Sequence, residues 1–305
     1  MPGRLGGAAP GGPRLRGGAG ARDDLGRRWG AGALDDTTGG GAAPTTRIDR
    51  NRPANARVWD YWLGGKDNYA VDREVGDAIA RMFPLIPDVA RADRDFLRRA
   101  VTFFARDGGV RQFLDVGTGL PAADNTHEVA QRIAPDARVV YVDHDPIVLA
   151  HARVLLAGTP EGQTAYVDAD AHDPAEILRH AADTLDFARP TALLMLGLLN
   201  FLVDDAAARH TASTLIDRLA PGSYVAITHP TYELGGEGNR AAMEFWNENA
   251  GQPIVARTPE QVRGFFDGLE LLEPGLVSCT RWRPDAGDVG AVPVLPQLGG
   301  VAVKR

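Results

Sequence analysis

The fold of this chain is decided by the stretch Phe113-Leu114-Asp115-Val116-Gly117-Thr118-Gly119-Leu120-Pro121-Ala122. It begins as an apolar strand, ends in an acid and opens into a turn that fits the pattern G-x-G-x-x-(G/A). A second apolar segment, 138–142, ends on another acid, Asp143, at about the 20-residue spacing expected of such folds. Glycines let the backbone approach a ligand closely, and the second acid can accept hydrogen bonds from ribose hydroxyls. The pattern predicts half of a nucleotide-binding α/β sheet, against the plain alternative of an ordinary turn and a solvated aspartate.

Strand and helix patterns alternate from residue 111 onward, which predicts a parallel sheet with right-handed crossovers. The strands are expected at 112–116, 138–142, 164–167, 191–196 and 224–228. The helices between them are expected at 123–133, from residue 145, from residue 173 and at 204–219. The second and third of these begin with Asp145-Pro146 and Asp173-Pro174, and an acid before proline is typical of a helix start. Two further helices, at 238–250 and 258–266, and two final strands, within 269–279 and at 300–304, complete the chain.

The region before the sheet divides into two parts. Residues 1–46 are rich in glycine and arginine and show no apolar periodicity, so we expect a disordered tail, either a basic tether or a plain solvated extension. Residues 47–110 predict an N-terminal helical cap with helices at 55–63, 72–82 and 87–106. Residues 111–305 then form the α/β domain.

Composition restricts the function classes. The chain has 305 residues, 44% of them hydrophobic, and a formal net charge of −7, which gives no electrostatic footprint for nucleic acid. A single cysteine, Cys279, excludes an internal disulfide framework. No apolar run reaches the roughly 20 residues of a membrane span, and no apolar segment follows the N-terminal arginines as in a secretory signal. We expect a cytoplasmic protein with no membrane and no nucleic-acid partner.

The cofactor is better predicted as S-adenosylmethionine than as a nicotinamide dinucleotide. Asp115 stands at the end of the first strand, where it can receive the ammonium group of a methionine moiety but would repel a pyrophosphate. No paired basic residues follow the turn to neutralise phosphates, and about 110 residues precede a strand that usually comes first in dinucleotide folds.

Further candidates follow the later strands, because ligands of open α/β sheets bind outside the carboxyl ends of the strands. Asp170, with the backbone N–H of Ala171 beside it, is placed to bind the adenine amine, and Gly197 is expected near the reactive end of the cofactor. Asn200 is a candidate to orient the substrate, with a loop cap as the alternative. His229 is a candidate general base, with a hydrogen-bonded rim histidine as the alternative. The histidines do not suggest a metal site, since His144 and His172 each precede an Asp-Pro cap.

The chain resembles class I S-adenosylmethionine-dependent methyltransferases in its Asp-Val-Gly-Thr-Gly turn, Tyr-Val-Asp143 and Asp168-Ala-Asp170. Segments 56–69, 112–121 and 127–131 resemble, more narrowly, an actinobacterial methyltransferase family of unknown substrate, formerly a domain of unknown function. The resemblance implies a Rossmann-like, seven-stranded, mostly parallel sheet with helices on both faces, an antiparallel last strand at 300–304, and a helical cap over the cofactor pocket. The predicted cofactor contacts are Asp115, Gly117, Thr118, Gly119, Asp143, His144, Asp170, Ala171 and Gly197, with Tyr61, Lys66 and Asn68 from the cap.

The activity predicted is methyl transfer from S-adenosylmethionine to an unidentified small-molecule acceptor. A proton acceptor is needed only for some substrates, and the candidates are His229, Asn200 and Tyr69. The chain departs from the family pattern at Asn200-Phe201, where a histidine is expected before the aromatic residue. This departure keeps a non-catalytic binding protein open as an alternative, and the glycine pattern alone keeps a nicotinamide-dependent oxidoreductase open. Cap aromatics such as Trp59, Trp62 and Trp246 would suit a partly apolar acceptor or would simply form core. Oligomeric state is not predicted.

Overall fold

The computed structural model of the chain describes residues 3, 48–155, 158–287 and 293–305. The description below concerns the unit formed by residues 40–305, as far as the structure describes them. The tail predicted for residues 1–46 lies outside the described residues except for Gly3.

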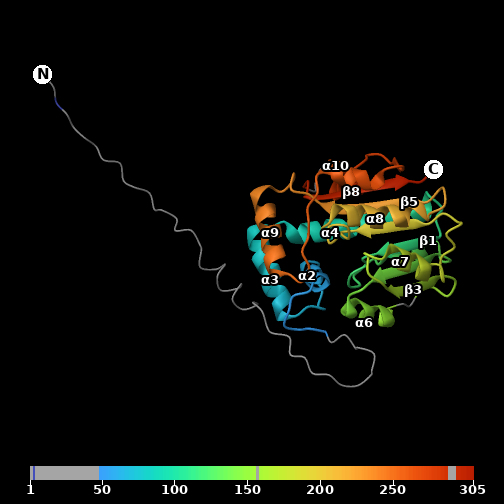
Figure 1. Cartoon of the computed structure of the whole chain (residues 1–305), viewed down its shortest axis with the longest axis horizontal. Helices are drawn as coiled ribbons and strands as arrows, with labels where there is room; N and C mark the ends of the chain where they lie inside the picture. Colours follow the sequence, from blue (N-terminus) through green and yellow to red (C-terminus); the bar gives the residue numbers. More distant parts are fainter. Residues whose placement is uncertain (1–2, 4–47, 156–157, 288–292) are drawn as a thin grey trace. The chain divides into compact units, whose positions relative to one another are not determined.

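The centre of this unit is an eight-stranded sheet in the order β3-β2-β1-β4-β5-β8-β6, with β7 paired to β8. The first five strands are parallel to one another, and β8 runs antiparallel to its neighbours (Figure 1). Their bounds are β1 Gln112–Val116, β2 Arg138–Asp143, β3 Gln163–Asp168, β4 Ala192–Leu196, β5 Tyr224–Pro230, β6 Glu270–Leu271, β7 Val277–Ser278 and β8 Gln297–Val303. The α/β class, the parallel order and the antiparallel last strand agree with the predictions.

The sheet has one strand more than predicted because segment 269–279 is not a single strand. It forms two short strands, β6 and β7, which both pair with β8. Pro274 and Gly275 lie between them, and Gly275 has a φ of +87°, a left-handed conformation that a continuous strand does not contain.

The helices are α2 Asn55–Trp62, α3 Ala70–Met82, α4 Ile86–Arg106, α5 Thr126–Ile133, α6 Pro146–Leu155, α7 Pro174–Ala181, α8 Asp205–Asp217, α9 Gly236–Asn249 and α10 Pro259–Arg263. Two 3₁₀ turns, η1 Gly264–Phe266 and η2 Cys279–Arg281, follow. Helix α5 starts later than the predicted residue 123, because Asn125 and Glu128 form a capping box at its N-terminus. Asp173 and Asp204 cap α7 and α8 by accepting from Glu176 N and Ala207 N.

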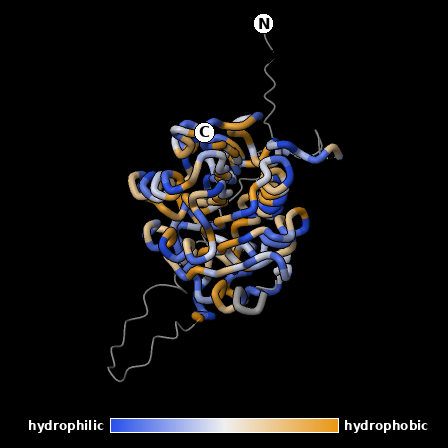
Figure 2. The backbone as a smooth tube through the Cα atoms, turned by 90° about the vertical axis from the view of Figure 1, so that its right-hand side faces the viewer, coloured by the Kyte–Doolittle hydropathy of each residue, from blue (hydrophilic) through white to orange (hydrophobic). Residues whose placement is uncertain are grey.

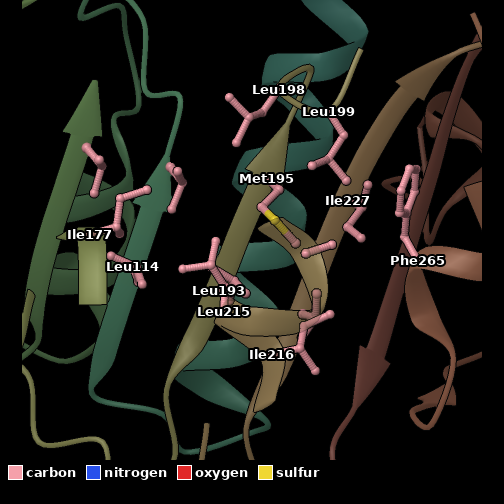
Figure 3. Close-up of a cluster of buried hydrophobic side chains, with 14 of the residues drawn as sticks. Leu114, Ile177, Leu193, Met195, Leu198, Leu199, Leu215, Ile216, Ile227 and Phe265 are labelled. Carbon is pink, nitrogen blue, oxygen red and sulfur yellow. The ribbon is translucent and has the colours of Figure 1, made fainter. Parts of the chain in front are cut away.

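The main core lies between one face of the sheet and helices α7 and α8 (Figure 3). Leu114 and Val116 of β1 point to this face, together with Leu193 and Met195 of β4. Since side chains alternate along a strand, Asp115 points to the opposite face, where Thr126 of α5 contacts it. Because side chains of β1 point alternately to the two faces of the sheet, the carboxylate of Asp115 lies on the face that α5 covers, opposite the main core.

A second group of helices stands beside the carboxyl ends of the strands. Helix α9, which follows β5, packs against α3, and α3 packs against α2 (Figure 1). Hydrophobic and hydrophilic stretches alternate over short distances along the backbone in Figure 2. Within the described residues, no helix is long and apolar enough to cross a membrane.

Candidate functional site

A cavity of about 760 Å³ opens at the carboxyl ends of the parallel strands. This volume lies in the range of small-molecule and cofactor sites. The turns after β1, β2, β3 and β4 form one side of the cavity, and residues of α2, α4 and α9 form the other. Of the predicted cofactor contacts, those on the sheet all line it: Asp115, Gly117, Thr118, Gly119, Asp143, His144, Asp170, Ala171 and Gly197.

The turn after β1 depends on its glycines. Gly117 and Gly119 have φ values of +76° and +67°, which L side chains rarely adopt. A Cβ atom on Gly117 would lie 2.6 Å from Leu198 Cδ1, so a side chain there would collide with the turn after β4. The turn is closed by Gly117 N donating to Val142 O and by Thr118 Oγ1 donating to Asp115 O. It therefore exposes backbone to the cavity in a way that suits close approach of a ligand.

Asp115 is a buried carboxylate without a direct cationic partner among the described residues. Its side chain accepts a hydrogen bond of 2.6 Å from Thr126 Oγ1. Burial raises its pKa to about 6, although the Thr126 bond and the charge of Arg94 favour the ionised form. The negative charge of Asp115 is therefore only partly balanced by neighbouring groups of the protein. A carboxylate of this kind on a cavity wall suits the ammonium group of S-adenosylmethionine.

Asp143 is held at the end of β2 by backbone donors. One carboxylate oxygen accepts from Gly119 N at 2.8 Å, and the other accepts from His144 N and Asp145 N at 2.8 and 3.0 Å. Burial raises its pKa in spite of these bonds. The bond to Gly119 N ties the glycine turn to the second strand, so the two parts of the predicted ribose site are in contact.

The adenine-side candidates are more exposed. Oδ1 of Asp170 accepts from His172 N at 2.8 Å and lies 2.8 Å from His172 Nδ1. Burial works to raise the pKa of Asp170, but the hydrogen bonds from His172 outweigh it and lower the pKa overall. Gly197, with a φ of +58°, donates its N–H to Thr228 Oγ1 at 2.9 Å, which fixes the turn after β4 against β5.

The structure does not bring the cap candidates to the cavity. Tyr61 donates to Asp77 Oδ1 at 2.7 Å on an exposed surface, and Lys66 is exposed. Asn68 donates to Asp60 Oδ2 and Gly65 O, so its amide organises the glycine loop. Tyr69 packs in an apolar cluster with Leu120 and Ile147, beside the cavity lining. None of these four predicted side chains is among the residues that line the cavity.

His229 also lies away from the cavity. Its Nδ1 is 2.8 Å from Pro230 O and its Nε2 is 2.9 Å from the Arg257 guanidinium. Burial lowers its pKa to about 4. Because both ring nitrogens are engaged inside the protein, this geometry does not present His229 to a substrate, and Asn200 is the one catalytic candidate of the sequence analysis that lines the cavity.

Sequence analysis missed several lining residues. Asp93 and Arg94 come from the middle of α4, which the sequence predicts as a long amphipathic helix. Asp60 comes from α2. Asp60 accepts from Asp67 N and from Asn68 Nδ2, both at 2.9 Å, and burial raises its pKa. The available signal was an acid within the apolar stripe of a helix, since α4 buries Asp93 between Val89 and Phe96.

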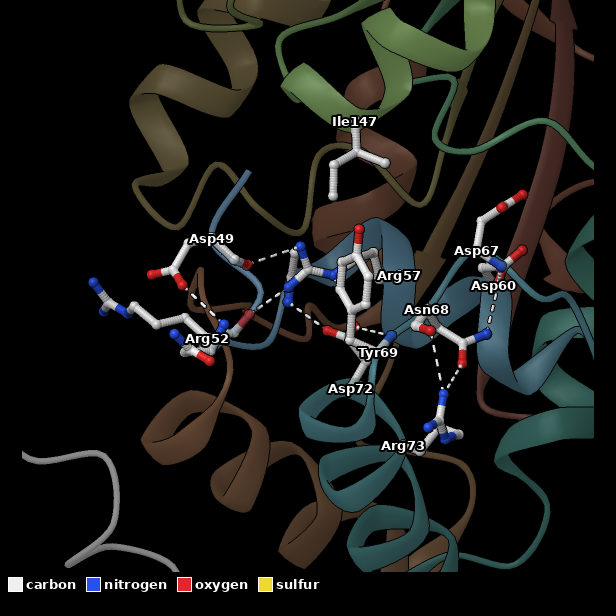
Figure 4. A network of polar contacts seen from close by, with 12 residues as sticks. Asp49, Arg52, Arg57, Asp60, Asp67, Asn68, Tyr69, Asp72, Arg73 and Ile147 are labelled. Carbon is white, nitrogen blue, oxygen red and sulfur yellow. Dashed lines mark hydrogen bonds and ion pairs between the residues drawn. The ribbon is translucent and has the colours of Figure 1, made fainter. Parts of the chain in front are cut away.

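An ion pair beneath the cavity wall holds the segment that enters α2 (Figure 4). Arg57 Nε donates to Asp72 Oδ2 at 2.8 Å, and both side chains are almost fully buried. The remaining guanidinium nitrogens donate to the carbonyls of Asp49 and Arg52. Ile48, Asp49 and Arg52 line the cavity, so this ion pair positions one of its walls.

Within the described ranges 48–155, 158–287 and 293–305, no group of three or more His, Cys, Asp or Glu residues could hold a metal ion. The cavity is lined instead by buried carboxylates, a glycine turn and apolar side chains. Such a lining suits a ligand that combines an organic cation with a nucleoside.

Comparison with known proteins gives the family. The family described as S-adenosyl methyltransferase matches residues 41–305. A protein of the DUF574 family from Streptomyces avermitilis has 44% sequence identity and a TM-score of 0.81, over 85% of this chain and 100% of that one. A candidate methyltransferase from Thermobifida fusca has 40% identity and a TM-score of 0.75, over 83% of this chain and 96% of that one. None of the curated proteins compared with the chain matches it.

These matches favour a methyltransferase over the two alternatives left open by the sequence, a nicotinamide-dependent oxidoreductase and a binding protein without activity. They also agree with S-adenosylmethionine as the cofactor that the buried carboxylates and the glycine turn suggest. The match covers the whole of the described sheet and its helices, and the chain belongs to the S-adenosyl methyltransferase family.

Proposed function

We propose that this chain is an active enzyme that transfers the methyl group of S-adenosylmethionine to a small molecule bound in the same cavity. The observation that carries the proposal is the single cavity in which Asp115, Asp143 and the Gly117–Gly119 turn meet apolar residues of α2, α4 and α9. The first group supplies the cofactor contacts, and the second supplies a partly apolar wall for an acceptor.

The position of each residue on the cavity wall supports the proposed contacts. Asp115 binds the ammonium group of the cofactor, and Arg94, whose charge acts on Asp115, is the nearby candidate for its carboxylate. Asp143 binds the ribose hydroxyls, for which its bond to Gly119 N must be shared or released. Asp170 and the Ala171 N–H bind the adenine edge. The N-terminal helices α2 to α4 serve as the cap of the 111–305 domain.

The chemistry requires mainly positioning. S-adenosylmethionine supplies a methyl group activated by its sulfonium, and transfer is an in-line displacement by a nucleophilic atom of the acceptor. The protein holds the two reactants in line and excludes water, which is the contribution that cap helices over a cavity can make.

The proposal is tested by titration calorimetry of the full chain with S-adenosylhomocysteine and, separately, with NAD. We expect micromolar binding of S-adenosylhomocysteine and no binding of NAD, because Asp115 presents negative charge where a pyrophosphate would lie. Binding of NAD alone, or of neither ligand, would overturn the assignment. Radioactive methyl transfer from S-adenosylmethionine to a panel of small acceptors then tests activity.

A further inference from the structure

The cofactor contacts proposed above leave one region of the cavity without an occupant. Asp93, Asn200 and Gln297 line the cavity and have no assigned cofactor contact; they come from α4, from the turn after β4 and from the start of β8. Asp93 is connected to Gln297 and, through Thr228, to the turn that leads to Asn200. Aromatic side chains of α2 and α9 line the same cavity. The chemistry of these residues indicates what the methyl acceptor carries.

Asp93 presents a buried carboxylate to this region. It is 6% exposed, and Gln297 Nε2 donates to its Oδ1 at 3.2 Å. Burial raises its pKa, whereas the hydroxyl of Thr228 and the amide of Gln297 both favour its ionised form. Thr228 Oγ1 also accepts the N–H of Gly197 at 2.9 Å, so Asp93 is connected through one hydroxyl to the turn after β4. This turn is where we expect the reactive end of the cofactor.

The fold provides no direct cation for this carboxylate among the residues that the structure describes. The charge of Arg94 lowers the pKa of Asp93 from a distance, but the guanidinium of Arg94 donates its hydrogen bonds to the carbonyls of Ala123 and Asp124. Arg57 is paired with Asp72. A buried carboxylate that lacks a cationic partner is unfavourable, and a positively charged ligand group relieves that cost.

Asn200 is an independent sign of a ligand. Its side chain is 6% exposed and lines the cavity, and its Oδ1 is buried with no hydrogen-bond partner in the described part of the chain. Its backbone carbonyl is already used, since it accepts from Val255 N at 2.9 Å. Buried polar groups are seldom left unpaired, so the unpaired amide oxygen of a residue that lines the cavity is available to a bound group with a hydrogen-bond donor.

The aromatic wall suits an apolar body with a positive charge. Trp62 packs against Trp59 and Trp246, with ring centroids 5.8 Å apart in both pairs. The indole N–H groups of Trp62 and Trp246 donate to Gly76 O and Gln252 O, so these rings carry no unmet donor. Their surfaces can bury an apolar group and attract a cation.

We propose that the methyl acceptor is a small amine with an apolar body, which binds through its ammonium group at Asp93, with the amide of Asn200 as a second contact, and is methylated on that nitrogen. This inference rests on the proposed function and extends it to the substrate class. An acceptor with a carboxylate or phosphate at this position would face Asp93 and is excluded by charge repulsion.

The proton balance of the reaction gives Asp93 a defined role. The bound ammonium transfers one proton to the Asp93 carboxylate, which leaves a neutral amine with a free electron pair. That pair forms the new N–C bond as the S–C bond breaks, so the sulfonium becomes a thioether and the nitrogen becomes a methylated ammonium. Asp93 returns its proton to solvent when the products leave. The position of its pKa above the ordinary value favours this transfer.

The test uses the full chain saturated with S-adenosylhomocysteine and three probes of one shape: phenethylamine, 2-phenylethanol and phenylacetate. Titration calorimetry should show phenethylamine binding about tenfold or more tightly than the alcohol, because a charged hydrogen bond is stronger than a neutral one, and phenylacetate binding least. Equal affinity for amine and alcohol, absence of binding by both, or preference for the carboxylate overturns the inference.

Variants separate this inference from the proposed function. Asp93→Asn should abolish the preference for the amine while S-adenosylhomocysteine affinity stays within about twofold, and Asn200→Leu should weaken the amine about fivefold. Asp95→Asn is the matched control, because Asp95 lies on the same helix and is 58% exposed. If Asp93→Asn still binds the amine more tightly than the alcohol, the role of Asp93 is overturned, whereas the proposed function is not affected. Loss of S-adenosylhomocysteine binding in the unaltered chain would instead overturn the proposed function.

Discussion

Asp115 is a buried carboxylate on the cavity wall, and its burial opposes its ionisation. It is 5% exposed, and burial raises its pKa from 3.8 to about 6. Because the folded-state pKa is above the unfolded value, the folded state binds more protons between about pH 4 and pH 6. Stability from this group is therefore complete below pH 4 and is lost as the pH rises through about 6. At neutral pH the residue is ionised, which is the form that an ammonium group requires.

We predict that Asp115→Asn stabilises the ligand-free chain at pH 7. A shift of about two pKa units corresponds to at most about 3 kcal/mol, and the variant should gain part of this in free energy of unfolding. Urea unfolding at pH 7 and pH 4.5 measures the effect, which should be smaller at the lower pH. The same variant should bind S-adenosylhomocysteine at least about tenfold more weakly. A variant with lower stability at pH 7 would contradict this account of Asp115.

A second prediction concerns Asp143. Asp143→Ala removes the proposed acceptor for the ribose hydroxyls and releases Gly119 N, so affinity for S-adenosylhomocysteine should fall about tenfold or more. Calorimetry measures the change. Asp168→Ala is the control, because Asp168 pairs with Asp143 in the sheet but is exposed and does not line the cavity. Unchanged affinity in the Asp143 variant would remove this residue from the ribose site.

At the scale of elements, the Arg57–Asp72 pair joins the start of α2 to the start of α3 (Figure 4). Asp72 accepts from Ala54 N and from Tyr69 N as well as from Arg57, so one carboxylate fixes both helix entries. Arg57 in turn holds the carbonyls of the segment that leads into α2. The helix starts and the cavity wall therefore depend on the same buried ion pair.

We predict that Arg57→Met destabilises the chain by about 3 kcal/mol, because it leaves Asp72 buried without its cation. Urea unfolding measures this loss, and hydrogen exchange should show faster exchange at residues 49–54. Arg73→Met serves as the control, since Arg73 is exposed and its guanidinium donates to Asn68 rather than to a buried carboxylate. A loss below about 1 kcal/mol would show that this pair does not hold the wall.

At the scale of the whole described unit, the cavity is built from distant parts of the sequence. Trp62 of α2 contacts Trp246 of α9, and α9 contacts α3. The loop after α9 also reaches the turn after β2, where Gln252 Nε2 lies 3.2 Å from His144 Nε2. We expect a ligand in this cavity to contact the turns of the sheet together with α2, α4 and α9.

We predict that S-adenosylhomocysteine at one hundred times its dissociation constant raises the free energy of unfolding by about 2.7 kcal/mol. Hydrogen exchange should slow both in the turn at 117–120 and in α2 and α9, since all three line the cavity. Protection limited to the turns of the sheet would contradict the proposed cap role of α2 and the proposed contact of α9 with the ligand.

Local patterns in the sequence were sufficient to predict the sheet and half of the cavity. The strand period, the acid–proline helix starts and the glycine turn each act over a few residues, so β1 to β5 and the positions of Asp115, Gly117, Asp143 and Asp170 could be predicted. The sequence also contains a local signal for the break between β6 and β7, since Pro274 and Gly275 lie between the two strands.

The other half of the cavity was decided only by tertiary packing. Whether Asp93 or His229 faces the cavity depends on how α4, β5 and α10 pack. Periodicity marks Asp93 as an acid on the buried side of α4, but it does not tell which other elements that side meets. The sequence alone determined the fold class, the cofactor type and the acids at the strand ends, because these follow from short-range backbone geometry. The tertiary structure decided which side chains of α2, α4 and α9 share the cavity with these acids. The physical reason is that contacts between residues such as Trp62 and Trp246 arise only when distant segments pack together.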